Sequence, residues 1–312
     1  MAIKELGYVV IETTMSQEWH EYLTGVAGVM PADNGADGAA HYRIDARPFR
    51  FRIEAASDER LAAAAYEVDT REALDALAAR IEAAGQSLHW GDQAAAKTRC
   101  VETYFRTSDP AGNGLEFYVG SASDNVEFVS PVGVSGFVTG EFGMGHAVFS
   151  APDFAATHGF YKDVLGFHDS DLPVFHLMGP DGPPMHFAFM HADNGRHHSI
   201  AVGEGPVPPS GCVHLMLEMR NLVDVGKCYD RMKQAGVPES ASLGRHTNDE
   251  VTGFYMQTPS GFDLEIGCDG LVIDPDKWEA TSHVTISDWG HEWAWQKAMA
   301  EEMAASEGDA EQ

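Results

Sequence analysis

Three side chains that can bind a divalent metal lie in three separate apolar segments of the chain. His146 and His214 each begin a strand-like segment, and Glu265 lies inside another, between Leu264 and Ile266. Alternation along these segments places the His and Glu side chains on the face opposite the apolar residues. Two imidazoles and one carboxylate bind Fe(II) and leave coordination positions open for a substrate and oxygen. The pattern therefore predicts a catalytic Fe(II) site, for which Mn(II) is an alternative metal.

An internal repeat tests whether these residues serve the fold or a function. Residues 6–12 match residues 144–150, and residues 110–116 match residues 259–265, so the chain has two similar halves. In the first half, the positions of the three proposed ligands hold Tyr8, Ala63 (to within a residue or two) and Glu116. Because the first half keeps the carboxylate and neither histidine, the repeat favours one metal site, in the second half, and a structural first half.

Each half contains two smaller units, each a strand followed by a helix and further strands. Apolar residues recur at helical spacing over residues 71–85, 154–166 and 222–236, and each segment ends in glycine. Curved sheets closing around the ligand-bearing faces would form a funnel with the metal inside. We therefore expect an α+β fold of four βαβββ modules in two domains. The expected divisions are a structural N-terminal domain at 1–135, a catalytic domain at 136–292 and an acidic tail at 293–312.

The composition excludes several classes of partner. The chain has 20 Lys and Arg against 48 Asp and Glu, a formal net charge of −28, so nucleic acids and anionic membrane surfaces are poor partners. The chain contains no run of about 18 apolar residues, so no membrane-spanning helix is predicted. Residues 1–10 lack the hydrophobic region of a signal peptide. The four cysteines are scattered, as expected for free thiols in a reducing compartment. These features predict a cytoplasmic protein.

The most specific motif of the chain lies at residues 244–265, where His246, Tyr255 and Glu265 stand at fixed separations. In this motif and in its repeat, the chain resembles the type I extradiol ring-cleaving dioxygenases of the vicinal oxygen chelate superfamily, over about residues 1–292. The resemblance implies a glyoxalase-like fold of paired modules. It also implies that O2 cleaves a bicyclic or larger catechol at non-haem Fe(II), in the degradation of aromatic compounds. The expected substrate is 2,3-dihydroxybiphenyl or a related dihydroxynaphthalene or alkylcatechol.

The resemblance also assigns roles to individual residues. Metal binding is assigned to His146, His214 and Glu265. Catalysis is assigned to His198, as acid and base, and to two residues that hydrogen-bond the substrate, His246 and Tyr255. The substrate pocket is expected to be lined by Val148, Phe187, Asn248 and Asp249.

Some of these assignments have a competing interpretation. His197 precedes His198, and strand alternation allows only one of them to face the metal; the resemblance favours His198. Asn248 and Asp249 are also a common turn pair. Phe187 is equally suited to an ordinary core position.

Two other functions are compatible with the predicted fold. A metal-dependent isomerase or lyase of the glyoxalase type would keep the fold and the metal but usually has a fourth protein ligand. A non-enzymatic protein that sequesters aromatic compounds would use the cavity without needing the metal ligands or an acid–base histidine. For the dioxygenase, the resemblance predicts a catecholic substrate and O2 as partners, and a homo-oligomer of up to eight subunits.

Overall fold

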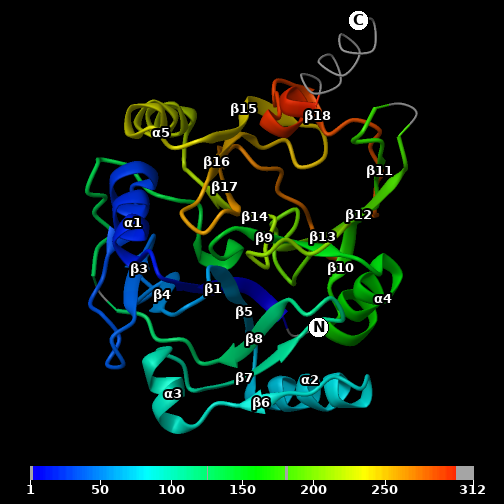
Figure 1. Cartoon of the computed structure of the whole chain (residues 1–312). Helices are drawn as coiled ribbons and strands as arrows, with labels where there is room; N and C mark the ends of the chain where they lie inside the picture. Colours follow the sequence, from blue (N-terminus) through cyan, green and yellow to red (C-terminus); the bar gives the residue numbers. More distant parts are fainter. Residues whose placement is uncertain (1–2, 125, 180–181, 300–312) are drawn as a thin grey trace, which may run out of the picture.

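The computed structural model describes residues 3–124, 126–179 and 182–299. Within these residues each half of the chain forms one mixed β-sheet, the first half below and the second half above in Figure 1. The first sheet has eight strands in the order β2-β3-β4-β1-β5-β8-β7-β6. Its strands are β1 (Ile3–Thr13), β2 (Met30–Pro31), β3 (Ala40–Arg43), β4 (Phe51–Ala55), β5 (Arg60–Val68), β6 (His89–Trp90), β7 (Thr103–Ser108) and β8 (Gly114–Val119).

The second sheet has the order β10-β12-β13-β9-β14-β17-β16-β15-β18, with β11 paired to β12 outside this path. Its strands are β9 (His146–Ala151), β10 (His168–Asp171), β11 (Val174–Phe175), β12 (Met185–His191), β13 (Ile200–Glu204), β14 (His214–Glu218), β15 (Glu239–His246), β16 (Thr252–Gln257), β17 (Asp263–Cys268) and β18 (Ser287–Trp289). The expected α+β fold of the glyoxalase type is confirmed.

The sequence repeat corresponds to a repeat in sheet topology. In the first sheet β1 pairs antiparallel with β5 and β5 pairs parallel with β8; β9, β14 and β17 repeat this pattern in the second. In each sheet, the first ligand position and the carboxylate pair with the same residue on the strand between them. These residues are Tyr8, Glu116 and Ala65 in the first sheet, and His146, Glu265 and Met216 in the second. Ala63 also takes the position of His214, because they pair with the equivalent Val10 and Val148.

The three predicted helices begin where a polar side chain accepts a hydrogen bond from a backbone N–H of the first turn. Thr70 caps α2 (Arg71–Ala83), and Asn221 caps α5 (Leu222–Ala235). Asp153 caps α4 (Phe154–Gly159), which continues as the π-helix η3 (Phe160–Leu165) and ends at the left-handed Gly166. The remaining helical segments are α1 (Ser16–Glu21), η1 (Tyr22–Ala27), α3 (Gln93–Thr98) and η2 (Gly140–Phe142).

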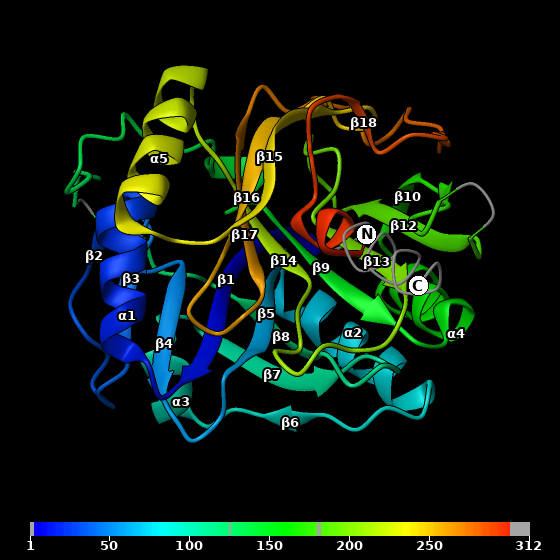
Figure 2. The ribbon, with the colours of Figure 1, turned by 45° about the horizontal axis from the view of Figure 1, so that its top comes forward.

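One continuous apolar core spans both halves. Leu215 and Leu217 belong to it, so the alternating side chains of β14, including His214, point to the other face of the sheet. Helical segments of the two halves also contact each other: Arg231 of α5 donates to the carbonyl of Val26, and Arg80 of α2 donates to that of Val164. Figure 2 shows α5 beside the segment that begins with α1. The helix layers therefore join the two sheets.

The C-terminal segment returns to the second sheet. Trp293 forms a β-bridge with Ala241, and residues 294–299 are helical. The first part of the predicted acidic tail is therefore packed on the sheet that carries the proposed ligands, and residues 300–312 lie outside the described residues. Among the described helices, none has the length and apolar character needed to cross a membrane.

Candidate metal centre and active site

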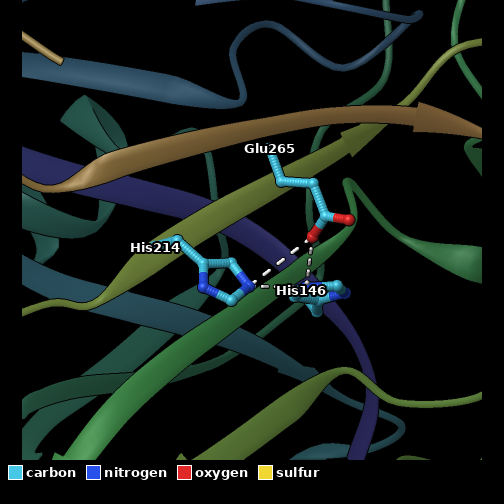
Figure 3. Close-up of side chains that lie close together, drawn as sticks. All are labelled: His146, His214 and Glu265. Atoms are coloured by element: carbon cyan, nitrogen blue, oxygen red, sulfur yellow. Dashed lines mark hydrogen bonds and ion pairs between the residues drawn. The ribbon is translucent and has the colours of Figure 1, made fainter. Parts of the chain in front are cut away.

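The three proposed metal ligands come from three adjacent strands. His146 begins β9, His214 begins β14 and Glu265 lies within β17. Because His146 and Glu265 pair with the same residue of β14, and His214 lies two residues before it, all three side chains extend from one face. Figure 3 shows them converging on a common point. The sequence-predicted cluster is therefore brought together by the register of the sheet.

The distances within the cluster fit one shared cation. His146 Nε2 lies 3.2 Å from His214 Nε2, and Glu265 Oε2 lies 3.3 Å and 3.5 Å from these two atoms. Glu265 Oε1 is buried and has no hydrogen-bond partner among the described residues. A buried carboxylate oxygen without a partner is costly unless a metal or donor satisfies it. The donor set, two imidazoles and a carboxylate, fits Fe(II).

The electrostatics keep His214 and Glu265 in the forms that bind metal. Burial lowers the pKa of His214 to about 3, so its imidazole is neutral and one ring nitrogen keeps a lone pair that can bind a metal. Burial opposes ionisation of Glu265, but the imidazoles of His146 and His246 outweigh this effect and hold the pKa of the carboxyl well below its usual range. The site therefore presents the negative charge of Glu265 beside the neutral imidazole of His214.

His246 and Tyr255 lie beside the cluster and are hydrogen-bonded to each other. His246 ends β15, Tyr255 lies in β16, and His246 Nε2 is 2.7 Å from the Tyr255 hydroxyl. His246 Nδ1–H donates to the carbonyl of Ile286 at 3.1 Å, which orients the ring. Burial opposes protonation of His246, but the Glu265 carboxylate outweighs it and raises the pKa of the imidazole to about 9. The pair can therefore donate hydrogen bonds to an anionic ligand.

His198 lies on the other side of the cluster. Its ring stacks on His146 at a centroid distance of 3.9 Å, and Phe189 packs edge-on against it. Burial and the nearby His146 keep the pKa of His198 well below its usual value. The ring of His197 is perpendicular to that of His198 and does not line the cavity that lies over the cluster. Of the two neighbours, His198 is thus the one that faces the cluster.

A cavity of about 200 Å³, which we call the main cavity because the proposed site lies in it, lies over the three-residue cluster. All ten residues predicted for the site line it: His146, Val148, Phe187, His198, His214, His246, Asn248, Asp249, Tyr255 and Glu265. Much of the remaining wall is apolar and was not predicted; these additional residues are Phe175, Leu177, Phe189, Val213, Asp263, Ile286, Trp293 and Trp295. Trp293 packs on the Tyr255 ring at 4.9 Å. The two tryptophans come from the predicted tail, and large aromatic side chains in that tail were the sequence feature that could have indicated a contact with the cavity.

The first half has a salt-bridged carboxylate in place of this centre. Tyr8, at the position of His146, donates to Glu116 Oε2 at 2.5 Å. Arg99 binds both Glu116 oxygens, at 2.7 and 2.8 Å, and Arg106 donates to Oε1 at 2.7 Å. The carboxylate is therefore satisfied by two guanidinium groups and a hydroxyl.

Two family models match the chain. The Glyoxalase/Bleomycin resistance protein/Dioxygenase superfamily matches residues 143–266, and the model described as dihydroxybiphenyl dioxygenase BphC D1 matches residues 6–55. An iron-dependent extradiol dioxygenase of Rhodococcus jostii strain RHA1 is 39% identical over 298 residues, which are 94% of this chain and 98% of the relative. A biphenyl-2,3-diol 1,2-dioxygenase of Paraburkholderia xenovorans strain LB400 is 38% identical, over 97% of this chain and 100% of the relative.

A solved structure agrees with these relatives. The crystal structure of BphC, a halotolerant catechol dioxygenase, has a TM-score of 0.86 and 33% identity, over 95% of this chain and 96% of that chain. The chain is thus an enzyme of the glyoxalase and dioxygenase superfamily, and within it belongs to the family of extradiol ring-cleaving dioxygenases. The family and enzyme class expected from the sequence are confirmed, and this finding favours them over an isomerase or a sequestration protein.

Proposed function

We propose that the chain is an Fe(II)-dependent dioxygenase that cleaves a bicyclic or larger catechol beside its two hydroxyl groups, with O2 as co-substrate. One observation carries this proposal: the ligand cluster, His198 and the His246–Tyr255 pair all line one cavity. An isomerase or a sequestration protein has no need for this combination of residues. A relative's description as iron-dependent supports the choice of metal, and Mn(II) remains compatible with the same ligands.

His146, His214 and Glu265 would hold the metal through Nε2, Nε2 and Oε2. When bound, the metal supplies Lewis acidity that lowers the pKa of the catechol hydroxyls, and open positions at which both reactants meet. The apolar wall around the cluster excludes water from the reacting groups and strengthens electrostatic interactions within the cavity.

The protein's own residues would move protons and stabilise charge. His198, buried and neutral, accepts a proton from a catechol hydroxyl and later returns it to an oxygen of the opening ring. The His246–Tyr255 pair donates hydrogen bonds to the catecholate oxygen as negative charge develops on it. Asn248 and Asp249, at the cavity wall, would contact the substrate through their polar side chains.

The apolar part of the wall supports a substrate with a second ring or a large substituent. Val148, Phe187, Phe175 and the two C-terminal tryptophans provide a surface that a monocyclic catechol would leave uncovered. We therefore propose 2,3-dihydroxybiphenyl or a related dihydroxynaphthalene or alkylcatechol. The similarity to a biphenyl-2,3-diol dioxygenase over 97% of the chain supports this substrate class.

The test is anaerobic loading with Fe(II), removal of unbound metal, and mixing with 2,3-dihydroxybiphenyl in oxygenated buffer. Equimolar uptake of oxygen and a yellow product whose colour depends on pH are expected, because extradiol cleavage gives a conjugated keto acid. The matched control is His198→Gln, which should retain iron and lose most of the turnover. Iron-containing protein that takes up no oxygen with monocyclic, bicyclic or steroid-like catechols would overturn the proposal.

We also propose that the parts of the chain differ in role: residues 1–135 form a structural domain, residues 136–292 form the catalytic domain and residues 293–312 form a tail. The salt-bridged Glu116 in the first sheet supports this division. A cytoplasmic location and a homo-oligomer of up to eight subunits stay predictions. The oligomer is open to measurement by analytical ultracentrifugation.

A further inference from the structure

His197 lies behind His198, on the side away from the main cavity. The two residues precede β13, both are buried, and their ring planes are perpendicular at a centroid distance of 5.4 Å. Their Nδ1 atoms are 3.2 Å apart, which is hydrogen-bond distance. His197 lines a second cavity of about 190 Å³, whereas His198 lines both cavities, as do His146 and Asp249. The Nδ1 atom of His198 therefore faces His197 rather than solvent.

A buried carboxylate stands on the far side of His197. Asp171 ends β10 with no exposed surface, and its Oδ2 lies 3.1 Å from His197 Nε2. Neither of these two atoms meets hydrogen-bond geometry with any group of the described residues, so their contact is a close approach of two buried polar atoms that have no other partner there. The other oxygen, Oδ1, accepts a hydrogen bond from the hydroxyl of Thr281. Burial opposes ionisation, but the His197 imidazole and the Thr281 hydroxyl outweigh it and lower the pKa of Asp171.

The donor and acceptor groups of Asp171, His197 and His198, which lie in a row, determine where the protons are. A carboxylate only accepts hydrogen bonds, so the His197 nitrogen that faces Asp171, Nε2, carries a proton. We take His197 as a neutral imidazole, whose other nitrogen is then an acceptor, so that His197 Nδ1 offers a lone pair to His198. The facing nitrogen of His198, Nδ1, must therefore carry the proton. His198 Nε2 is left with its lone pair free.

We propose that Asp171 and His197 are positioning residues that hold His198 in the tautomer whose Nε2 can act as a base. The inference rests on the proposed role of His198 in proton transfer from a catechol. In that step the catechol O–H bond breaks, the oxygen keeps the electron pair, and the proton bonds to His198 Nε2. The positive charge so formed is shared through the Nδ1–Nδ1 contact with His197 and stabilised by Asp171.

A second carboxylate near His198 is a weaker candidate for this role. Asp249 Oδ2 lies 3.8 Å from His198 Nδ1, beyond hydrogen-bond distance, whereas His197 Nδ1 is 3.2 Å away. Asp249 Oδ1 accepts from the backbone N–H of Val251 at 3.1 Å, which holds this carboxylate in its loop. Distance therefore assigns the orientation of His198 to His197.

The surroundings hold His197 in place and supply a matched control. The Ser170 hydroxyl donates to the carbonyl of His197, and the Trp278 ring packs edge-on against the imidazole. His191 is another buried histidine of the same cluster, with Nδ1 2.8 Å from the Ser170 hydroxyl. His191 contacts Ser170, which holds the backbone of His197, and it does not contact His198. His191→Gln therefore disturbs the packing without breaking the row of ring nitrogens.

The direct test is the position of the ring proton on His198 in metal-free protein with ¹⁵N-labelled histidine rings. Long-range ¹H–¹⁵N spectra distinguish the two tautomers, and the His198 signals are those that disappear in His198→Gln. We expect the proton on Nδ1 in the wild type and in His191→Gln. Asp171→Asn and His197→Phe should shift it, wholly or partly, to Nε2. A proton on Nε2 in the wild type, or no shift in either variant, would overturn the proposal.

The second readout is steady-state turnover of the iron-loaded protein. Asp171→Asn and His197→Phe should lower kcat by roughly 100-fold, at the lower end of what general acid–base catalysis contributes, with little change in KM or iron content. His191→Gln should stay within about twofold of the wild type; an equal loss in His191→Gln would reduce His197 to a packing residue. A wild type without turnover would overturn the proposed function instead, while the spectra, which need neither iron nor substrate, would still decide the tautomer.

Discussion

Glu265 connects the metal ligands to the hydrogen-bonding pair, because its two oxygens face different partners. Oε2 lies 3.3 Å from His146 Nε2, whereas Oε1 lies 3.5 Å from His246 Nε2. His198 stacks on His146 but lies outside the three-residue cluster. Metal binding and proton transfer should therefore be separable by single substitutions within one cavity.

Glu265→Gln and His198→Gln form a matched pair that tests this separation. Glu265→Gln removes the one carboxylate among the three proposed ligands, so bound iron and turnover should both fall to background. His198→Gln should retain the wild-type iron content and lose roughly 10²- to 10⁴-fold in kcat, the usual contribution of an acid–base residue. Metal analysis and oxygen-uptake kinetics on the same preparations provide the measurement. Full iron retention in Glu265→Gln would remove it from the ligand set.

At the scale of strands and helices, the sequence predicts the features that follow from the internal repeat and from the alternation of side chains along strands. The ligand positions follow from strand alternation and from the match between the halves, because register fixes the face of every side chain. The wall formed by Phe175 and Ile286 could not be predicted, because these contacts are made by a short strand and a loop without a periodic pattern. The salt bridge from Arg99 to Glu116 joins residues whose approach depends on the loop after α3.

The salt bridge in the first sheet should contribute to stability rather than to catalysis. Arg99→Ala would leave the fully buried Glu116 with Arg106 as its remaining cation, and we expect a loss of about 3 kcal/mol in the free energy of unfolding. Arg71→Ala, which breaks an exposed pair with Asp75, should cost less than about 1 kcal/mol. Urea unfolding measures both. Equal losses would mean that burial of Glu116 does not set the energy of its salt bridge.

The first sheet should also lose stability in mild acid through His41. Burial, reinforced by the adjacent Arg52, lowers the pKa of His41 to about 4 from 6.5. Between these values the unfolded chain binds a proton at His41 that the folded protein does not, so stability falls as pH falls from 6.5 to 4, by roughly 3 kcal/mol for this group.

His41→Gln keeps an acceptor for Arg52 and should flatten the pH dependence by that amount. His89→Gln, at an exposed position, is the control. Urea unfolding at several pH values measures the slope, and an unchanged slope in His41→Gln would contradict the prediction.

For the molecule as a whole, the continuous core predicts that the two halves unfold together. Apolar residues of both sheets form one cluster, and α5 contacts η1 while α2 contacts η3. Separating the halves would expose apolar surface on both, so a state with only one half folded is unfavourable. A change that stabilises one half should consequently raise the unfolding temperature of the other half as well.

Metal binding provides the test of this cooperation. The proposed iron site lies in the second half, and iron at 100 times its Kd would stabilise the folded state by about 2.7 kcal/mol, or roughly 4 °C in Tm for a chain of this size. Differential scanning calorimetry should show a single transition that rises by this amount with Fe(II) under anaerobic conditions and returns with a chelator. Arg99→Ala, in the other half, should lower the same transition by roughly 5 °C, whether or not iron is bound. Two transitions, one responding only to iron and the other only to Arg99→Ala, would show that the shared core does not couple the halves.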